Sequence, residues 1–257
     1  MKRLLLLAAL AVSTWPAAIL AQQAVAPKAV APKAADAKEA APAKAAAPEA
    51  AAPAPAAAEP AAARGAAPAA KPDLARAEQL AKTICGACHG VDGNSAIPVN
   101  PSLAGLPAEY ITLQLNHFKG GIRVNPIMLG MSMTLSPEDM TALGLYFSKQ
   151  VPKGQVAKDP ALAKAGQAFY RGGNMAAGIP ACAACHGPNG AGIPKNYPRL
   201  AGQHADYAYA QLKAFKAGER GADTGGKDLN GRIMAAIAAK MTDAQMKAVT
   251  DYTAGLR

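Results

Sequence analysis

The N-terminal part of the chain carries a single long apolar run. Residues 4–20 are almost all apolar, and they follow the basic start Met1-Lys2-Arg3. The run contains Pro16 and is slightly shorter than a usual membrane-spanning helix. A basic start before such a run is typical of a secretory signal peptide. We therefore expect residues 1–21 to be a signal peptide that exports the chain to the periplasm; left uncleaved, the run would tether the protein to the membrane.

The next segment, residues 22–72, shows no hydrophobic period at all. Of its 51 residues, 27 are alanine and 9 are proline. Prolines at this density interrupt helices, and alanine buries too little surface to offset the entropy of ordering. The pattern predicts a disordered Ala/Pro-rich spacer, whose role is either that of a solubilising tail or that of a tether.

Helical periodicity begins after residue 73 and predicts an all-α fold. Apolar positions recur every three to four residues in four segments, which are 74–84, 107–119, 161–171 and 205–217. Two further helices have N-cap signals, in Ser136-Pro137-Glu138-Asp139 and in Thr242-Asp243-Ala244-Gln245. Gly/Pro-rich loops lie between these segments, and none of them alternates as a strand would.

The same part of the chain contains an internal repeat of two copies. Residues 85–121 match positions 97 residues further on, and from Met128 the offset becomes 106, so that Met128, Met140 and Tyr146 match Met234, Met246 and Tyr252. The second copy thus has nine extra residues, around 221–229. A period near 100 is too long for a solenoid. We predict two tandem domains, domain 1 (residues 73–153) and domain 2 (residues 154–257), joined at a linker with Pro152, Gly154 and Pro160.

All four cysteines of the chain fall in a duplicated Cys-x-x-Cys-His motif. Two thiols at this spacing can form thioethers with the two vinyl groups of a haem, while the next residue turns its imidazole onto the iron. Two disulfides or one four-cysteine zinc site are the alternatives. The 93 residues between Cys88 and Cys182 argue against zinc, and neither alternative explains the histidines. The motifs predict two covalently attached haem c groups, at Cys85, Cys88 and His89 and at Cys182, Cys185 and His186.

The repeat also selects candidates for the second axial ligand of each iron. The candidates are His117, Met128, Met131 and Met133 in domain 1 and His204 in domain 2, but of these only Met128 has a like residue at its matching position, Met234. Met140 and Met246 are duplicated too, but they lie inside predicted helices, so we expect them to be residues of the hydrophobic core. We therefore expect Met128 and Met234, placed in the loop before the last helix of each copy, to be the axial ligands. His/Met ligation fills both axial positions and suits electron transfer.

With these motifs, residues 73–257 resemble the dihaem cytochromes c4, which are two class I cytochrome c domains in tandem. The resemblance also rests on residues 100–105 and 197–202, on the Tyr…Gln-Leu helices, and on the Met-x6-Leu/Met-Ser/Thr endings. It implies that the carbonyl groups of Pro101 and Pro198 orient His89 and His186, and that the haem propionates meet between the domains. Two features depart from the family: the long spacer, and Glu78 where the first helix often has a glycine packed against the last helix.

Composition and charge now take on a narrower meaning. Much of the 51% hydrophobic content is alanine, which fills little volume in a core, so each small domain needs its haem as an apolar centre. The net charge of +10 reduces to zero for domain 1 and +6 for domain 2. This asymmetry suggests that domain 2 docks an acidic partner surface; nucleic-acid binding is not expected of an exported haem protein.

Taken together, the sequence predicts a monomeric electron carrier and not an enzyme. The expected donor is a quinol-oxidising complex or a dehydrogenase, and the expected acceptor is a terminal oxidase. The alternatives are a dihaem peroxidase, a thiosulfate-oxidising dihaem enzyme, or an electron-entry subunit of a membrane dehydrogenase. A peroxidase needs a releasable axial position, and the thiosulfate enzymes use an extra cysteine that this chain lacks.

Overall fold

The computed structural model describes residues 71–222 and 225–257 of the chain. The predicted signal peptide and nearly all of the predicted spacer lie outside these residues. Within the described part, no helix has the length and the apolar character needed to cross a bilayer.

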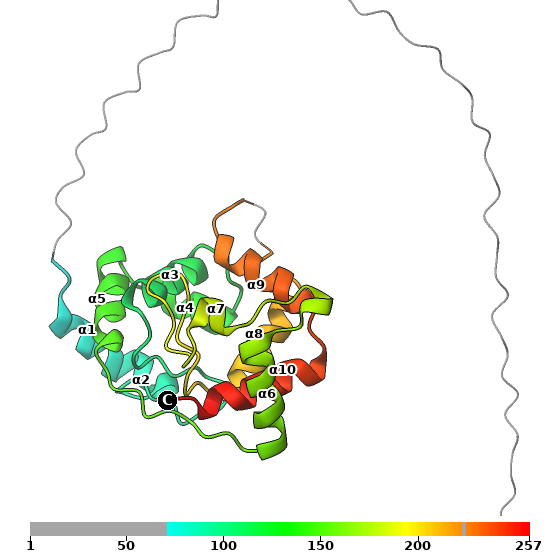
Figure 1. Ribbon diagram of the computed structural model, residues 1–257. Helices are drawn as coiled ribbons and strands as arrows, with labels where there is room; N and C mark the ends of the chain where they lie inside the picture. Colours follow the sequence, from blue (N-terminus) through cyan, green and yellow to red (C-terminus); the bar gives the residue numbers. More distant parts are fainter. Residues whose placement is uncertain (1–70, 223–224) are drawn as a thin grey trace, which may run out of the picture. The chain divides into compact units, whose positions relative to one another are not determined.

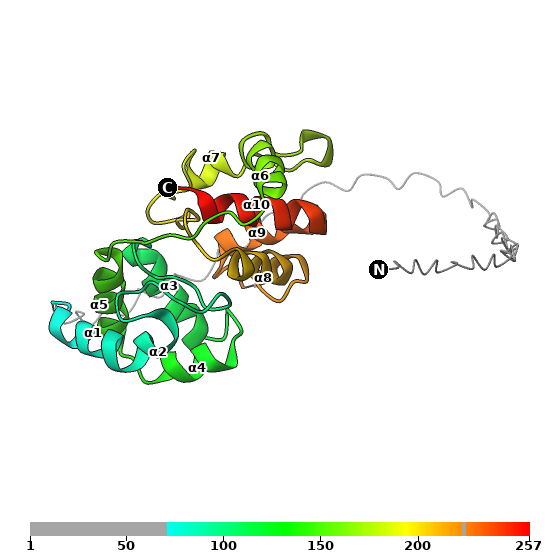
Figure 2. The ribbon, with the colours of Figure 1, turned by 90° about the horizontal axis from the view of Figure 1, so that it is seen from below.

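The fold is helical, and its helices form two similar sets (Figures 1 and 2). Domain 1 consists of α1 (Leu74–Leu80), a π-helical turn η1 (Ala81–Cys85), α2 (Gly86–His89), α3 (Ala108–Lys119), α4 (Pro126–Met133) and α5 (Pro137–Ser148). Domain 2 consists of α6 (Pro160–Gly172), a 3-10 turn η2 (Met175–Ala177), α7 (Ala183–His186), α8 (Ala205–Lys216), α9 (Leu229–Ala239) and α10 (Asp243–Gly255). Over the described ranges the only β pairing is two isolated bridges, so the all-α prediction is confirmed.

The last helix of each set begins where its sequence signal predicted. The Ser136 side chain accepts a hydrogen bond from the Asp139 N–H at 3.1 Å, and the Asp139 carboxylate accepts one from the Ser136 N–H. Thr242 and Gln245 form the same reciprocal pair at the start of α10. These capping boxes satisfy N–H groups that a helix end leaves without partners. They fix the starts of α5 and α10, against which the first helix of each set packs.

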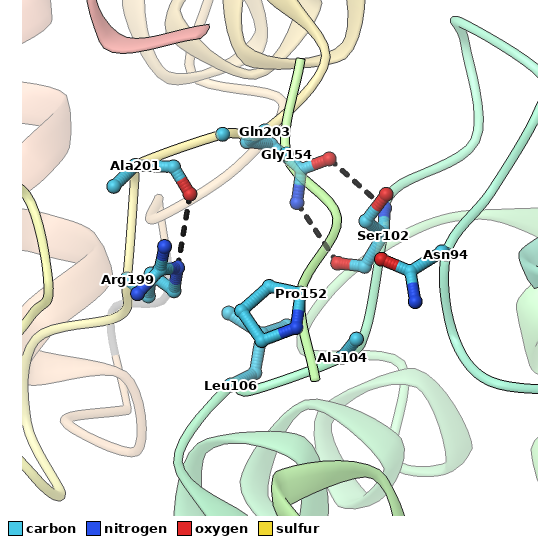
Figure 3. Close-up of a pocket in the computed structure, with 10 residues that line it drawn as sticks. Asn94, Ser102, Ala104, Leu106, Pro152, Gly154, Arg199, Ala201 and Gln203 are labelled. Atoms are coloured by element: carbon cyan, nitrogen blue, oxygen red, sulfur yellow. Dashed lines mark hydrogen bonds between the residues drawn. The ribbon is translucent and has the colours of Figure 1, made fainter. Parts of the chain in front are cut away.

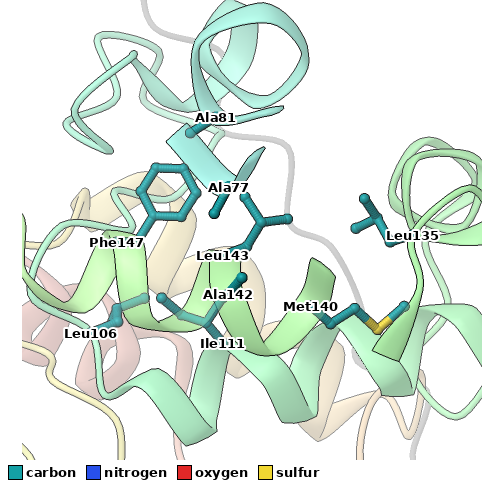
Figure 4. Packing of buried hydrophobic residues seen from close by; sticks show 9 residues of the cluster. All are labelled: Ala77, Ala81, Leu106, Ile111, Leu135, Met140, Ala142, Leu143 and Phe147. Carbon is teal, nitrogen blue, oxygen red and sulfur yellow. The ribbon is translucent and has the colours of Figure 1, made fainter. Parts of the chain in front are cut away.

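In domain 1 the core forms where α1 and α3 pack against α5. Figure 4 shows Leu143 and Phe147 of α5 beside Ala77 and Ala81, and both alanines are completely buried. Glu78, by contrast, is exposed and pairs with Lys82 at 2.6 Å. The expectation that Glu78 occupies the crossing of the first and last helices is therefore wrong. Ala77, one residue earlier, lies there, and its small side chain permits a close approach.

The matching crossing in domain 2, between α6 and α10, is closer still. A Cβ atom on Gly166 would lie 2.0 Å from the Ala248 carbonyl oxygen and 2.7 Å from Tyr252 Cβ. Tyr170, one turn further along α6, is completely buried in the core. Gly166 and Tyr170 thus correspond to Ala77 and Ala81, at an offset of 89 residues instead of 97. Domain 2 has eight more residues between its first helix and its cysteines, a length difference that comparison of the motifs alone does not detect.

Candidate haem-binding sites

Each cysteine pair lies on a short stretch of helix that ends at the histidine. In domain 1 the chain is helical from η1 through α2, and in domain 2 Cys182 is the residue before α7. Residues three apart on a helix face the same side, so both thiols of a pair can reach one ligand. None of the four cysteines forms a disulfide. Burial raises the pKa of Cys85 and of Cys182 to about 11, so each thiol stays protonated until it reacts.

The two histidines are held in the same way. His89 Nδ1 lies 2.8 Å from the Pro101 carbonyl oxygen, and His186 Nδ1 lies 2.9 Å from that of Pro198. A carbonyl oxygen only accepts, so Nδ1 carries the proton, and Nε2 keeps the lone pair that a metal needs. Burial lowers the pKa of both histidines, which favours the neutral ring. Both contacts implied by the family resemblance are thus present, and each orients an imidazole for axial ligation.

The turn that follows each histidine depends on a glycine. Gly90 and Gly187 have φ values of +76° and +79°, a region that other residues rarely adopt. A Cβ atom on Gly90 would also lie 2.4 Å from the Asn94 carbonyl oxygen. The turn therefore lets the chain reverse immediately after the candidate haem-binding histidine and return toward the proline.

Several residues that sequence reasoning missed support these turns. In domain 1 the hydroxyl of Ser95 and the side-chain amide of Asn100 both donate to the Cys88 carbonyl, at 3.0 and 3.2 Å. In domain 2 the Tyr170 hydroxyl donates to the Gly187 carbonyl at 2.6 Å. Ser95 and Tyr170 have no like residue at the matching positions, so the repeat gave no signal for them.

The candidate axial methionines lie on helices, not in the predicted loops. Met128 is in the first turn of α4, where its N–H donates to the Asn125 side chain at 2.9 Å. Met234 is in the middle of α9. The sequence pattern missed both helices because their N-caps, Asn125 and Asp228, stand among Gly- and Pro-containing loops. Both methionines are partly buried, whereas Met131 and Met133 on α4 are exposed.

The other candidate ligands have different roles. Met140 and Met246 are 1% and 2% exposed and belong to the two cores, as expected. His117 is buried, with Nδ1 3.9 Å from the Asp228 carboxylate of domain 2. His204 is also buried, and its Nε2 lies 2.8 Å from the Ser95 carbonyl oxygen of domain 1. Both histidines therefore contribute to contacts between the domains.

The surroundings of these side chains fit a haem group. Large apolar side chains remain exposed along the segments between each histidine and its methionine and on the methionine helices. They are Val91, Ile97, Val99, Leu113, Val124, Ile127, Leu129, Met131 and Met133 in domain 1 and Ile193, Leu229 and Ile233 in domain 2. Single exposed apolar residues are ordinary, but several of them in the segments that join each histidine to its methionine are what a porphyrin would cover.

Two arginines join the domains in a reciprocal arrangement. Arg123 of domain 1 donates to Gln114 of its own domain at 2.7 Å and to Tyr207 and Gln211 of domain 2, both at 2.9 Å. Arg220 of domain 2 mirrors these bonds: it donates to Gln211 at 2.7 Å, to Gln114 at 3.1 Å and to the Tyr110 hydroxyl at 3.2 Å. Each guanidinium also lies over a phenylalanine ring of its own domain, 4.5 Å from the centroid. Residues at matching positions of the two copies therefore make equivalent contacts from both sides of the interface.

A second group of contacts links the loops that contain the prolines (Figure 3). Gln203 accepts a hydrogen bond from the Ser102 N–H at 2.9 Å and donates one to the Ser102 carbonyl, also at 2.9 Å. Ser102 directly follows Pro101, whose carbonyl holds His89. The histidine environment of domain 1 is therefore bonded directly to domain 2.

Comparison with known proteins agrees with this geometry. The family model of cytochrome c matches residues 74–149 and 163–256. Cytochrome c4 of Azotobacter vinelandii is 42% identical over 192 residues, which is 71% of this chain and 89% of that protein. A thiosulfate dehydrogenase electron acceptor of Thiomonas intermedia (strain K12) is 43% identical over 173 residues, which is 66% of this chain and 77% of that protein. The crystal structure of reduced recombinant cytochrome c4 from Pseudomonas stutzeri superposes with a TM-score of 0.66 at 39% identity, covering 72% of this chain and 99% of that one.

The chain belongs to the cytochrome c family and, within it, to the dihaem cytochromes c4. Its two Cys-x-x-Cys-His motifs are the attachment sites of two covalent haem c groups, and its function is electron transfer. Both the expected fold class and the expected cofactor are thereby confirmed.

Proposed function

We propose that this chain is exported to the periplasm, where it carries electrons in a respiratory chain from a quinol-oxidising complex or a dehydrogenase to a terminal oxidase. The single observation that carries the proposal is the pair of histidines whose Nδ1 atoms are bonded to proline carbonyls at 2.8 and 2.9 Å. Each histidine would bind the iron of one haem, with a methionine of the same domain as the second axial ligand. The chain acts as a monomer and takes up one electron in each domain.

The geometry of the two sites supports a proposal for the residues that would hold the haem groups. The thiols of Cys85, Cys88, Cys182 and Cys185 form the thioethers, and His89 and His186 are the proximal ligands, oriented by Pro101 and Pro198. Met128 and Met234 are the distal ligands. The bound haem supplies a one-electron ferrous/ferric couple. With a protein side chain at both axial positions, no position is left for a substrate, which favours a carrier over a peroxidase.

The electron donor has a second candidate. The Thiomonas intermedia relative is described as an electron acceptor of thiosulfate dehydrogenase. The present chain would then receive its electrons from a separate thiosulfate-oxidising enzyme. It is not proposed to oxidise thiosulfate itself, because its four cysteines are all used in haem attachment.

Charge supports a docking role for domain 2. Residues 154–257 contain 13 basic and 7 acidic residues, whereas residues 73–153 contain six of each. An acidic redox partner would be attracted to domain 2. Rates of electron transfer should fall as salt is added, chiefly when charges of domain 2 are involved; rates independent of salt would contradict this role.

The rest of the chain organisation remains as first predicted. We propose a signal peptide over residues 1–21, a spacer over residues 22–72, and domains bounded at residues 73–153 and 154–257. If the signal is not cleaved, the spacer would let a membrane-tethered protein reach its partners.

The ligand assignment is tested by the ferric absorption spectrum. A methionine sulfur bound to ferric haem gives a charge-transfer band, so Met128→Ala and Met234→Ala should each remove about half of it, and the double variant all of it. Met131→Ala and Met133→Ala are matched controls, because these exposed methionines lie on the same helix as Met128. An unaltered band in the double variant would overturn the assignment.

A further inference from the structure

The last turn of α3 and the last turn of α8 end in lysines whose side chains reach back across the fold. Lys119 Nζ donates to the Leu135 carbonyl oxygen at 2.6 Å. Lys216 Nζ donates in the same way to the Met241 carbonyl oxygen. Leu135 and Met241 are buried, at 7% and 2% exposure, and each directly precedes the N-cap of the last helix. The two bonds are therefore equivalent in the two domains.

Each accepting carbonyl marks the end of the segment that bears a candidate axial methionine. Met128 is seven residues before Leu135, and Met234 is seven residues before Met241. The segments themselves differ: α4 spans 8 residues and α9 spans 11. The same lysine bond is nevertheless kept in both domains, so it does not depend on the length of the methionine helix.

The start of each segment is held by the same turn of helix. The N–H groups of Ile122 and Arg123 donate to the His117 carbonyl at 2.9 and 3.1 Å. In domain 2, Glu219 and Arg220 donate to the Ala214 carbonyl at 2.9 and 3.2 Å. Backbone bonds thus fix the beginning of the segment to the end of α3 or α8, while a lysine side chain fixes its other end to that turn.

We infer that Lys119 and Lys216 are positioning residues that keep Met128 and Met234 on their irons, an inference that rests on the ligand assignment proposed above. A cationic donor to a carbonyl forms one of the stronger hydrogen bonds in proteins. Without it, the C-terminal end of the methionine helix loses a charged bond to α3 or α8, and packing of α4 on α3 or of α9 on α8 is left to hold the helix. An added ligand then displaces the methionine from the iron more readily, while the fold around the histidine is unaffected.

The test uses the ferric holoprotein with imidazole as the competing ligand. Lys119→Leu and Lys216→Leu remove the donor and keep an apolar stem. Loss of the Met–iron charge-transfer band during an imidazole titration gives the affinity at each haem. On the strength of a charged hydrogen bond, we expect each variant to raise the affinity for imidazole about tenfold or more at one haem.

The domain affected is identified by combination with the ligand variants. In a Met234→Ala background the remaining band reports domain 1, so Lys119→Leu should lower the imidazole concentration at which this band is lost, and Lys216→Leu should not. In a Met128→Ala background the pattern should reverse. Lys149→Leu and Lys213→Leu are matched controls on exposed lysines of α5's end and of α8, and neither should change the titration.

A second measurement separates positioning from general destabilisation. The midpoint of urea unfolding, followed by circular dichroism, should stay close to the wild-type value in variants whose imidazole affinity has risen. Wild-type imidazole affinity in both lysine variants would overturn the inference, as would an equal rise at both haems or in the controls. If wild type lacked the charge-transfer band, the ligand assignment would have failed; a normal band with unchanged lysine variants would overturn only the role of the lysines.

Discussion

The close packing of α6 against α10 predicts that Gly166→Ala destabilises domain 2. A Cβ atom there would lie 2.0 Å from the Ala248 carbonyl oxygen, 2.6 Å from its carbon and 2.7 Å from Tyr252 Cβ. Two of these three atoms belong to the backbone of the opposite helix, so no side-chain rotation relieves the overlap. Normal carbon contacts lie at about 3.5 Å or more, and the helices would have to move apart by about 1 Å or more.

The size of the effect follows from two opposing contributions. Forcing a methyl group into a packed crossing costs about 1–3 kcal/mol, and more where the backbone has to move. Alanine recovers up to about 1 kcal/mol because it forms helix better than glycine. Tyr170, completely buried one turn away, would lose packing as the helices separate. Because the backbone has to move and Tyr170 loses packing, the cost lies at or above the top of that range, and we expect a net loss of about 2–3 kcal/mol in the free energy of unfolding of domain 2.

Urea unfolding of the holoprotein, followed by circular dichroism and by haem absorbance, measures this loss. Gly172→Ala is the matched control, because Gly172 lies in the same helix and a Cβ atom there would have no neighbour within 4 Å. The control should be unchanged or slightly more stable. The reasoning is refuted if Gly166→Ala unfolds at the same urea concentration as the control.

Three further changes are predicted. In the reverse experiment, Ala77→Gly should destabilise domain 1 by about 1 kcal/mol or more in urea unfolding, because it removes a buried methyl and loosens α1; unchanged stability would contradict the assigned crossing. Arg76, whose Nε lies 2.5 Å from the carboxylate, lowers the pKa of Asp139. The contribution of the ionised Asp139 to stability is therefore present above the pKa of about 3.9 that an aspartate has in the unfolded chain, and it is lost as the pH falls through the lower pKa of the folded protein. Acid titration of stability should show the deficit of Asp139→Asn shrinking below about pH 4, and a constant deficit would argue against the pair. Arg123→Met should split unfolding into separate transitions for the two domains, since it removes two hydrogen bonds across the interface; a single unchanged transition would show that the interface does not couple them.

Much of the site could be predicted because haem attachment restricts a few residues in a local pattern. Each Cys-x-x-Cys-His motif lies within five consecutive residues, and duplication separated Met128 from Met131 and Met133 without any structure. The capping signals at Ser136 and Thr242 are equally local, and both helices begin there. Short-range chemistry of this kind can be seen directly in a sequence.

The features that were missed depend on contacts distant in sequence. The role of Ala77 depends on which side chains of α5 pack against it, so the family resemblance alone placed Glu78 at the crossing. The bonds of Arg123 and Arg220 span 84 to 110 residues. Their duplication at an offset of 97 was nevertheless visible in the sequence. An arginine repeated at matching positions is therefore a usable signal for an interface, although its partners emerge only from the fold.

Each chain is proposed to pass one electron through each of two haem groups with histidine and methionine ligands. An anaerobic coulometric titration of the ferric protein, followed at the Met–iron charge-transfer band, measures this electron count. We predict that the whole band disappears over two electron equivalents per chain, each step following a one-electron curve. A band that accounts for only one haem, or one that is absent while both irons are still reduced, would contradict the claim.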